Sequence, residues 1–297
     1  MGTLINSHFL ALTVFITVGY QFISAITVLH KFDKDNDHAG ITNFVILAIS
    51  ALVLKGSKNF RQLVLPLLVL VWGLRLGLFL VIRIMQWGQD RRFDGRRGSL
   101  CRLVIIAMLQ VIWVWTLSLP VTFVIASDRH PSLQAKDIIG WTLWSVGFLI
   151  EAIADQQKLA FKFPPENRDR WCSTGLWRYS RHPNYFGEIL LWWGVFVASS
   201  PLLEGGTWIV IVGPILHTML ILFASGMPWL EESANTRYGH INPYRAYRDA
   251  TSPLIPLPPV VYLYLPRWFK IAFLFELPLY SVTLPSLQAR KSHPSSH

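Results

Sequence analysis

The sequence contains little charge and little cysteine. Of its 297 residues only 15% are charged and 52% are hydrophobic, and 17 acidic residues stand against 27 Lys and Arg. So small a polar fraction leaves more apolar surface than one soluble core of this size can bury. Two cysteines, Cys101 and Cys172, are too few for a disulfide framework or a four-ligand structural zinc site. We therefore expect a lipid bilayer to surround most of the chain.

Motifs of several common protein classes are missing. No Gly-x-Gly-x-x-Gly turn occurs, so a Rossmann nucleotide fold is not expected. Only His293 and His297 are closely spaced histidines, which argues against a diiron hydroxylase or desaturase, and we expect no metal site. The net charge of +10 comes with 13 Trp and 9 Tyr. Basic loops and aromatic belts at a membrane surface explain this combination better than nucleic-acid binding does.

Long apolar runs occupy much of the chain. A helix of about 20 apolar residues crosses the hydrocarbon core of a bilayer. Seven runs approach or exceed that length: residues 4–29, 41–54, 63–84, 103–125, 138–154, 186–203 and 208–225. The sequence therefore predicts an all-α, polytopic integral membrane protein with about seven transmembrane helices. An eighth run, residues 260–280, is interrupted by Pro266, Arg267 and Lys270, and this favours an interfacial helix over a span.

Basic residues are distributed unequally between the two sides that these runs define. One side holds Lys31, Lys34, Arg83, Arg91, Arg92, Arg96, Arg97, Arg102, Lys158, Lys162, Arg168, Arg170, Arg178, Arg181 and every Lys or Arg from Arg237 onward. The other side holds only Lys55, Lys58, Arg61, Arg129 and Lys136. Because short loops rich in Lys and Arg stay in the cytosol, we expect the first side, with the C-terminal tail, to be cytosolic.

Charged residues beside or within the apolar runs are candidates for function. Arg75 lies near the middle of the third run, where a guanidinium is costly unless it is paired or hydrated. A functional role and a structural ion pair, for example with Glu151, explain it equally well, and the neighbouring Gly73 and Gly77 let another helix approach closely. Arg91 and Arg92 follow in a basic loop that suits either phosphate oxygens or lipid headgroups.

The most informative segment is residues 175–188, Gly-Leu-Trp-Arg-Tyr-Ser-Arg-His-Pro-Asn-Tyr-Phe-Gly-Glu. It runs straight into an apolar span, and Pro183 is typical of a first helical turn. Such a junction places many hydrogen-bonding groups beside the positive end of a helix dipole, which favours anions. Gly187 allows a flat ring or a backbone to come close. A second polar cluster, residues 231–256, is expected to fold back under the helices, although an amphipathic surface helix is an alternative for it.

These segments resemble a membrane family similar to the C-terminal domain of steroid 5α-reductases. The resemblance covers most of the chain and is most specific at residues 72–77, 90–93, 154–158, 175–188 and 237–256. More distantly the chain is similar to sterol C14 and C7 reductases and to isoprenylcysteine carboxyl methyltransferases. The resemblance implies one transmembrane reductase-like domain over residues 1–288, with a cofactor-binding half at about 138–258. The polar residues 289–297 are expected to be disordered.

The resemblance also implies NADPH as cofactor and reduction of a C=C bond in a lipophilic sterol-, polyprenoid- or acyl-like substrate. The cofactor-binding residues that it implies are Arg91, Arg92, Lys158, Arg178, Arg181, His182, Asn184, Gly187, Glu188, Tyr244 and Arg245. Glu188, Tyr185 and Tyr244 are candidate proton donors. Arg75 is a candidate for stabilising an electron-rich intermediate. The endoplasmic reticulum is the expected location.

Two departures and two alternatives limit this interpretation. Trp72 stands where steroid 5α-reductases have a tyrosine, and residues 41–54 contain no carboxylate, so a 4-ene-3-oxo steroid is a doubtful substrate. Methyltransferases that use S-adenosylmethionine share the Arg-His-Pro-x-Tyr core, so lipid or prenylcysteine methyl transfer is the alternative activity. A non-enzymatic membrane scaffold is the third possibility. Both enzyme classes require three segments to converge on one anion-accepting cavity. These are residues 178–188, the basic loop with Arg91 and Arg92, and the second polar cluster.

Overall fold

The computed structural model describes residues 7–29, 36–55, 59–87, 100–129 and 131–284. Over these ranges the structure is helical and contains no strand. The α-helices are α1 (Ser7–Leu29), α2 (Asn36–Lys55), α3 (Phe60–Trp87), α4 (Leu100–Ala126), α5 (Ala135–Lys162), α6 (Pro183–Ser199), α7 (Val212–Met219), α8 (Met227–Tyr238), α9 (Asn242–Ala250), α10 (Pro259–Tyr264) and α11 (Arg267–Leu274). Short 3-10 turns and one π turn, Leu220–Ala224, connect several of them.

Five helical segments are long and apolar enough to cross a membrane. They are His8–Ile26, Phe60–Gln86, Val104–Ala126, Ala135–Lys162 and Gly205–Tyr238. The apolar part of α2, Ala39–Leu54, and the 17-residue α6 are shorter. The prediction of an all-α, polytopic membrane protein is confirmed, whereas the count of seven spans stays a prediction. Residues 260–280 contain two short helices, α10 and α11, in place of one continuous helix, and their interfacial position stays a prediction.

The chain divides into two compact units. Unit 1 comprises residues 1–146 and 190–217, and unit 2 comprises residues 147–189 and 218–297. The boundaries fall inside α5, at the seventh residue of α6 and near the end of α7. The single domain expected over residues 1–288 stays a prediction, and residues 289–297 lie outside the described residues.

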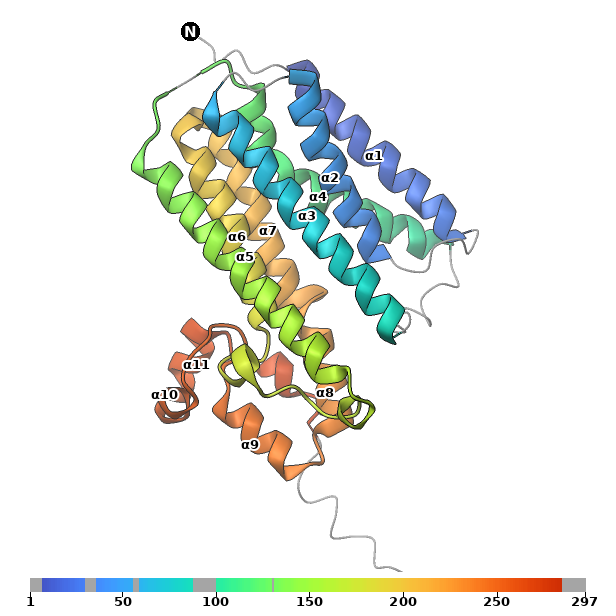
Figure 1. Ribbon diagram of the computed structural model, residues 1–297, viewed down its shortest axis with the longest axis vertical. Helices are drawn as coiled ribbons and strands as arrows, with labels where there is room; N and C mark the ends of the chain where they lie inside the picture. The colour runs from blue at the N-terminus through green and yellow to red at the C-terminus, as the bar shows by residue number, and fades with distance from the viewer. Residues whose placement is uncertain (1–6, 30–35, 56–58, 88–99, 130, 285–297) are drawn as a thin grey trace, which may run out of the picture. The chain divides into compact units, whose positions relative to one another are not determined.

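In unit 1, α2 packs along α3 and α1 packs along α4 (Figure 1). A Cβ on Gly73 would lie 2.8 Å from the side chain of Val45, so the expected close approach of a neighbouring helix is confirmed, and that helix is α2. The core holds an aromatic cluster in which the rings of Phe44, Trp72 and Trp192 pack 5.1–5.5 Å apart. Arg75 is half-buried on α3 with its guanidinium 5.6 Å from the ring of Phe79.

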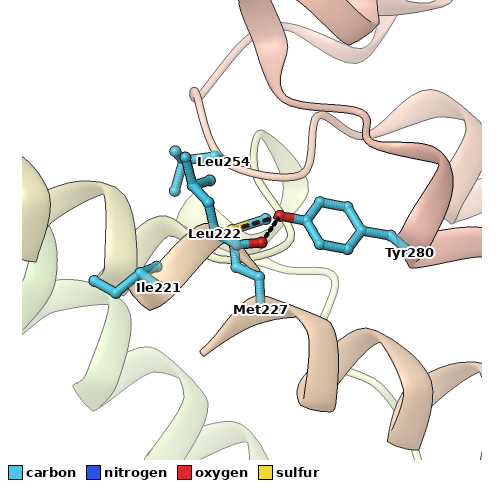
Figure 2. Packing of buried hydrophobic residues seen from close by; sticks show 5 residues of the cluster. All are labelled: Ile221, Leu222, Met227, Leu254 and Tyr280. Atoms are coloured by element: carbon cyan, nitrogen blue, oxygen red, sulfur yellow. Dashed lines mark hydrogen bonds between the residues drawn. The ribbon is translucent and has the colours of Figure 1, made fainter. Parts of the chain in front are cut away.

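Unit 2 has a core of its own. One cluster of its buried residues comprises Ile221, Leu222, Met227, Leu254 and Tyr280. Figure 2 shows the Tyr280 side chain reaching this group, and its hydroxyl donates to the carbonyl of Leu222 at 2.7 Å. Tyr185 and Phe186, at the start of α6, pack against the same cluster. The C-terminal residues thus help to fix the beginning of α6.

Candidate functional site

The loop before α6 is anchored on the second half of α5. The indole Nε1 of Trp177 donates to the carbonyl of Ala154 at 2.9 Å, and the backbone N–H of Leu176 donates to Gln157 Oε1 at 2.8 Å. Gly175 has a φ of 60°, which favours glycine, and a Cβ there would lie 2.3 Å from that same oxygen. Lys158 places its ammonium 4.4 Å from the Trp177 ring. These contacts fix the residues that lead into α6.

The second polar cluster runs beside this loop. Ser180 and Ser252 form a parallel bridge in which the N–H of Arg181 donates to the carbonyl of Ser252 at 2.8 Å. The Ser180 hydroxyl donates to the carbonyl of Leu254 at 2.8 Å. Residues 175–188 therefore contact the second polar cluster as expected, and an anion-accepting cavity between them stays a prediction. The prediction of convergence also included the basic loop with Arg91 and Arg92, and this loop lies outside the described residues.

A buried ionic network joins the loop, α8 and the C-terminal residues. Arg181 donates through Nε to Glu231 at 3.1 Å and through one terminal nitrogen to both oxygens of Glu276 at 3.0 Å. Its other terminal nitrogen donates to the carbonyls of Arg248 and Thr251. Every nitrogen of the Arg181 guanidinium thus has a protein acceptor. A phosphate contact by Arg181 stays a prediction, and it would require these bonds to open.

The charges of the network balance. Arg248 lies 3.6 Å from Glu231 and 3.6 Å from Glu276, so two guanidinium groups face two carboxylates. The Tyr262 hydroxyl donates to Glu276 at 2.6 Å. Burial, together with the charge of Glu276, raises the pKa of Tyr262 and keeps that hydroxyl protonated. Because the buried charges neutralise one another, an anionic ligand would have to find its positive charge among exposed residues.

Two buried acceptors at the start of α6 have no donor. His182 Nε2 lies 2.8 Å from Glu231, which assigns the N–H of a neutral imidazole to Nε2. His182 Nδ1 then carries a lone pair, and it has no hydrogen-bond partner among the described residues. The side-chain oxygen of Asn184, two residues later, is likewise buried without a partner there. Unpaired buried acceptors are costly, so this position suits a ligand that brings hydrogen-bond donors.

The stability of the protein is expected to fall in acid through His182. Burial lowers the pKa of His182, and this outweighs the opposing effect of Glu231. The unfolded chain therefore takes up a proton as the pH falls below about 6.5, while the folded state resists it, at up to about 1.4 kcal/mol per pH unit. Thermal unfolding between pH 7 and pH 5 should show this loss. His182→Gln should reduce it, whereas H240Q, at an exposed position, should not.

Gly187 lies against the backbone of α5. A Cβ on Gly187 would lie 2.5 Å from the carbonyl oxygen of Gly147 and 2.6 Å from the backbone nitrogen of Glu151. The expectation that a backbone approaches this glycine is confirmed. The backbone of α5 occupies the space on this side of α6, and the assignment of Gly187 to a cofactor stays a prediction. Glu188 follows, half-buried.

The other predicted site residues differ in their surroundings. Arg178 is exposed and makes no hydrogen bond or ion pair with any described residue. Tyr185 stacks on His182 with ring centroids 5.8 Å apart. Tyr244 is buried against Trp171, and its hydroxyl lies 3.4 Å from Asn235 Oδ1. Arg245 Nε donates to the carbonyl of Gly239 at 2.6 Å. Arg178 is thus a predicted phosphate contact whose guanidinium N–H groups have no acceptor among the described residues.

Three network residues were absent from the predicted site. Arg248 and Glu231 were noticed only as members of a polar cluster, and Glu276 was not singled out. Glu276 lies 95 positions after Arg181, in a mostly apolar run whose other charged residues are Arg267 and Lys270. A single acidic residue in such a run is itself a signal, because a carboxylate among apolar neighbours needs a cationic partner.

Comparisons with known proteins give few relatives. An uncharacterized protein of Schizosaccharomyces pombe is 26% identical over 175 residues, which are 51% of this chain and 48% of that protein. The chain thus spans about half the length of this relative. No solved structure matches. Residues 23–251 match a family described as "Protein of unknown function (DUF1295)". Since the match covers more than half of the sequence, the chain belongs to this family.

Proposed function

We propose that this protein is an NADPH-dependent membrane reductase that saturates a C=C bond of a lipophilic, sterol-, polyprenoid- or acyl-like substrate. Its family falls in the steroid 5α-reductase-like group. The proposal also places the polar parts of unit 2 on the cytosolic side of the endoplasmic reticulum, in keeping with the excess of Lys and Arg in those segments.

The observation that carries the proposal is the pair of unpaired acceptors, His182 Nδ1 and Asn184 Oδ1. A nicotinamide ring bears a carboxamide NH₂, and ribose hydroxyls are further donors, so the residues fit this cofactor. NADPH supplies a hydride when bound. The chain itself would orient the ring through Asn184. The exposed Arg178 guanidinium would bind a phosphate.

The candidate proton donors are not equivalent. Burial, and then the nearby charge of Glu231, raise the pKa of Tyr244 to about 12. A hydroxyl so reluctant to ionise is a weak acid at neutral pH. Tyr185 stacks on His182, and Glu188 lies one helical turn after Asn184. We therefore rank Glu188 and Tyr185 above Tyr244. Arg75, half-buried in unit 1, stays a candidate for stabilising charge on the substrate.

Methyl transfer from S-adenosylmethionine is the second candidate. The α-ammonium group of that cofactor is also a donor and fits the same two acceptors. It carries one carboxylate and no phosphate, however, so the exposed Arg178 would bind a carboxylate in place of a phosphate. This difference allows a binding experiment to separate the two functions.

The test is ligand-dependent thermal stability of the purified protein in detergent with NADPH, NADH or S-adenosylmethionine. A ligand at a hundredfold over its dissociation constant stabilises the folded state by about 2.7 kcal/mol. We expect stabilisation by NADPH that Asn184→Ala abolishes. Without ligand, N184A should be as stable as the original protein or about 1 kcal/mol more stable, because it removes a buried acceptor that has no donor.

The matched control is Asn167→Ala, since Asn167 lies after α5 and its side-chain oxygen accepts from the exposed Arg170. N167A should keep the full response to NADPH. Stabilisation by S-adenosylmethionine alone would favour the methyltransferase. A response to NADPH that survives in N184A would show that these acceptors do not hold the cofactor.

A further inference from the structure

The helices α10 and α11 turn a large apolar surface outward. Val260, Tyr264 and Trp268 are 68%, 86% and 65% exposed. Leu263 and Phe273 are also more than half exposed. Single exposed apolar residues are common, but five of them within two short consecutive helices are typical of an interaction site. The patch lies in residues 259–274, beyond the match to the family, which ends at residue 251.

The opposite side of the two helices is fixed to unit 2. Tyr262 is buried on α10, and its hydroxyl donates to Glu276 in the ionic network. Leu274 is buried at the end of α11. The Lys270 ammonium lies 4.3 Å from the Tyr262 ring, which ties α11 to α10. The exposed residues therefore lie on the side of α10 and α11 that points away from these contacts.

The lengths of α10 and α11 and the charge beside them indicate what covers their exposed side. Helices of six and eight residues are about 9 and 12 Å long, far short of the roughly 30 Å hydrocarbon core. Arg267 is exposed at the start of α11, and Glu276, the one acidic residue between positions 259 and 284, is bonded to Arg181 and Tyr262. The exposed side of these helices thus carries apolar side chains together with one Tyr, one Trp and the positive charge of Arg267. These properties complement anionic phospholipid headgroups.

We propose that α10 and α11 form an in-plane anchor that inserts Val260, Tyr264 and Trp268 into an anionic phospholipid surface. The chain is a polytopic membrane protein, so such a surface is always within its reach. Tyr264 and Trp268 lie at headgroup depth, where amphipathic rings are most stable, and Arg267 contacts lipid phosphates. The anchor does not depend on which cofactor the protein binds.

The test is depth-dependent quenching in vesicles that hold the full chain. Cys101→Ala and Cys172→Ala remove the native thiols, and Tyr264→Cys, Trp268→Cys or Asp249→Cys then carries a fluorescent label. Asp249 is the matched control because it is exposed on α9 of the same unit. We expect headgroup nitroxide lipids to quench the labels at 264 and 268 at least about twofold more strongly than the label at 249. Aqueous iodide should show the reverse order.

Vesicles of phosphatidylcholine with and without phosphatidylserine test the charge. Lipid quenching at Trp268→Cys should be stronger with phosphatidylserine, and Arg267→Glu should remove that difference. Labels at 264 and 268 that iodide quenches as strongly as the label at 249 would show that the surface faces water. Labels protected from both quenchers would show that protein covers it. Either of these results overturns the proposal.

Discussion

Replacing Glu231 with Ala is expected to destabilise the protein by about 3–5 kcal/mol, the cost of breaking a buried ion pair from one side. Glu231 accepts from Arg181 and His182 and lies 3.6 Å from Arg248. Without its carboxylate, two buried guanidinium groups would share the single charge of Glu276. Since neither arginine can lose its proton, the excess positive charge would stay in the interior.

Thermal unfolding in detergent measures this effect. A loss of this size should lower the melting temperature by on the order of 10 °C. The matched control is Glu232→Ala, because Glu232 is the next residue on α8 and is exposed. E232A should change stability by no more than about 0.5 kcal/mol. Equal melting temperatures for the two variants would mean that the network contributes nothing to the fold.

The helices and the main junction were predictable from the sequence. Several apolar runs are long enough to cross a bilayer. Inside the bilayer the backbone of such a run satisfies its hydrogen bonds by forming a helix. Pro183 marked the beginning of α6, which the structure places at that residue. The return of the tail to this junction was also predictable, because its Tyr and Arg residues suit a membrane boundary and not a span.

The pairing inside the network was not predictable. The family resemblance implied that Arg181 is a phosphate or adenosine contact, and a guanidinium beside a helix start suits that chemistry. Its actual partners come from α8, from the end of α9 and from Glu276, and only tertiary packing selects them. Gly187 was ambiguous for the same reason. A missing Cβ admits a ring or a backbone equally, and the spacing along one helix does not say which will come.

The closed network changes the expected roles of the basic residues. Arg181 and Arg248 hold the segment before α6 against α8 and the C-terminal residues, and Arg178 remains exposed. Structural arginines are thus buried and paired, while the arginine suited to a ligand lies three residues before Arg181. The anchor on α10 and α11 connects to the same network through Tyr262 and Glu276. The position of Asn184 therefore depends on contacts that span most of unit 2.

Replacing Gly187 with Leu is expected to destabilise the protein by roughly 3 kcal/mol, at the upper end of overpacking effects. A Cβ at this position would lie 2.5 and 2.6 Å from backbone atoms of Gly147 and Glu151, and ordinary contacts begin at 3.4 Å. Unlike a side chain, the backbone of α5 cannot relieve this overlap by changing rotamer. The two helices would have to separate by about an ångström, and they would lose contacts along their shared face.

The matched control is Gly206→Leu, because a Cβ on Gly206 has no atom within 4 Å. G206L should leave the melting temperature within about 2 °C of the original, as surface changes generally do. G187L should lower it by on the order of 10 °C and should also weaken the response to NADPH, since Asn184 lies one turn earlier on α6. If G187L were as stable as G206L, α5 and α6 would not pack backbone to backbone. The orientation of Asn184 would then need another cause.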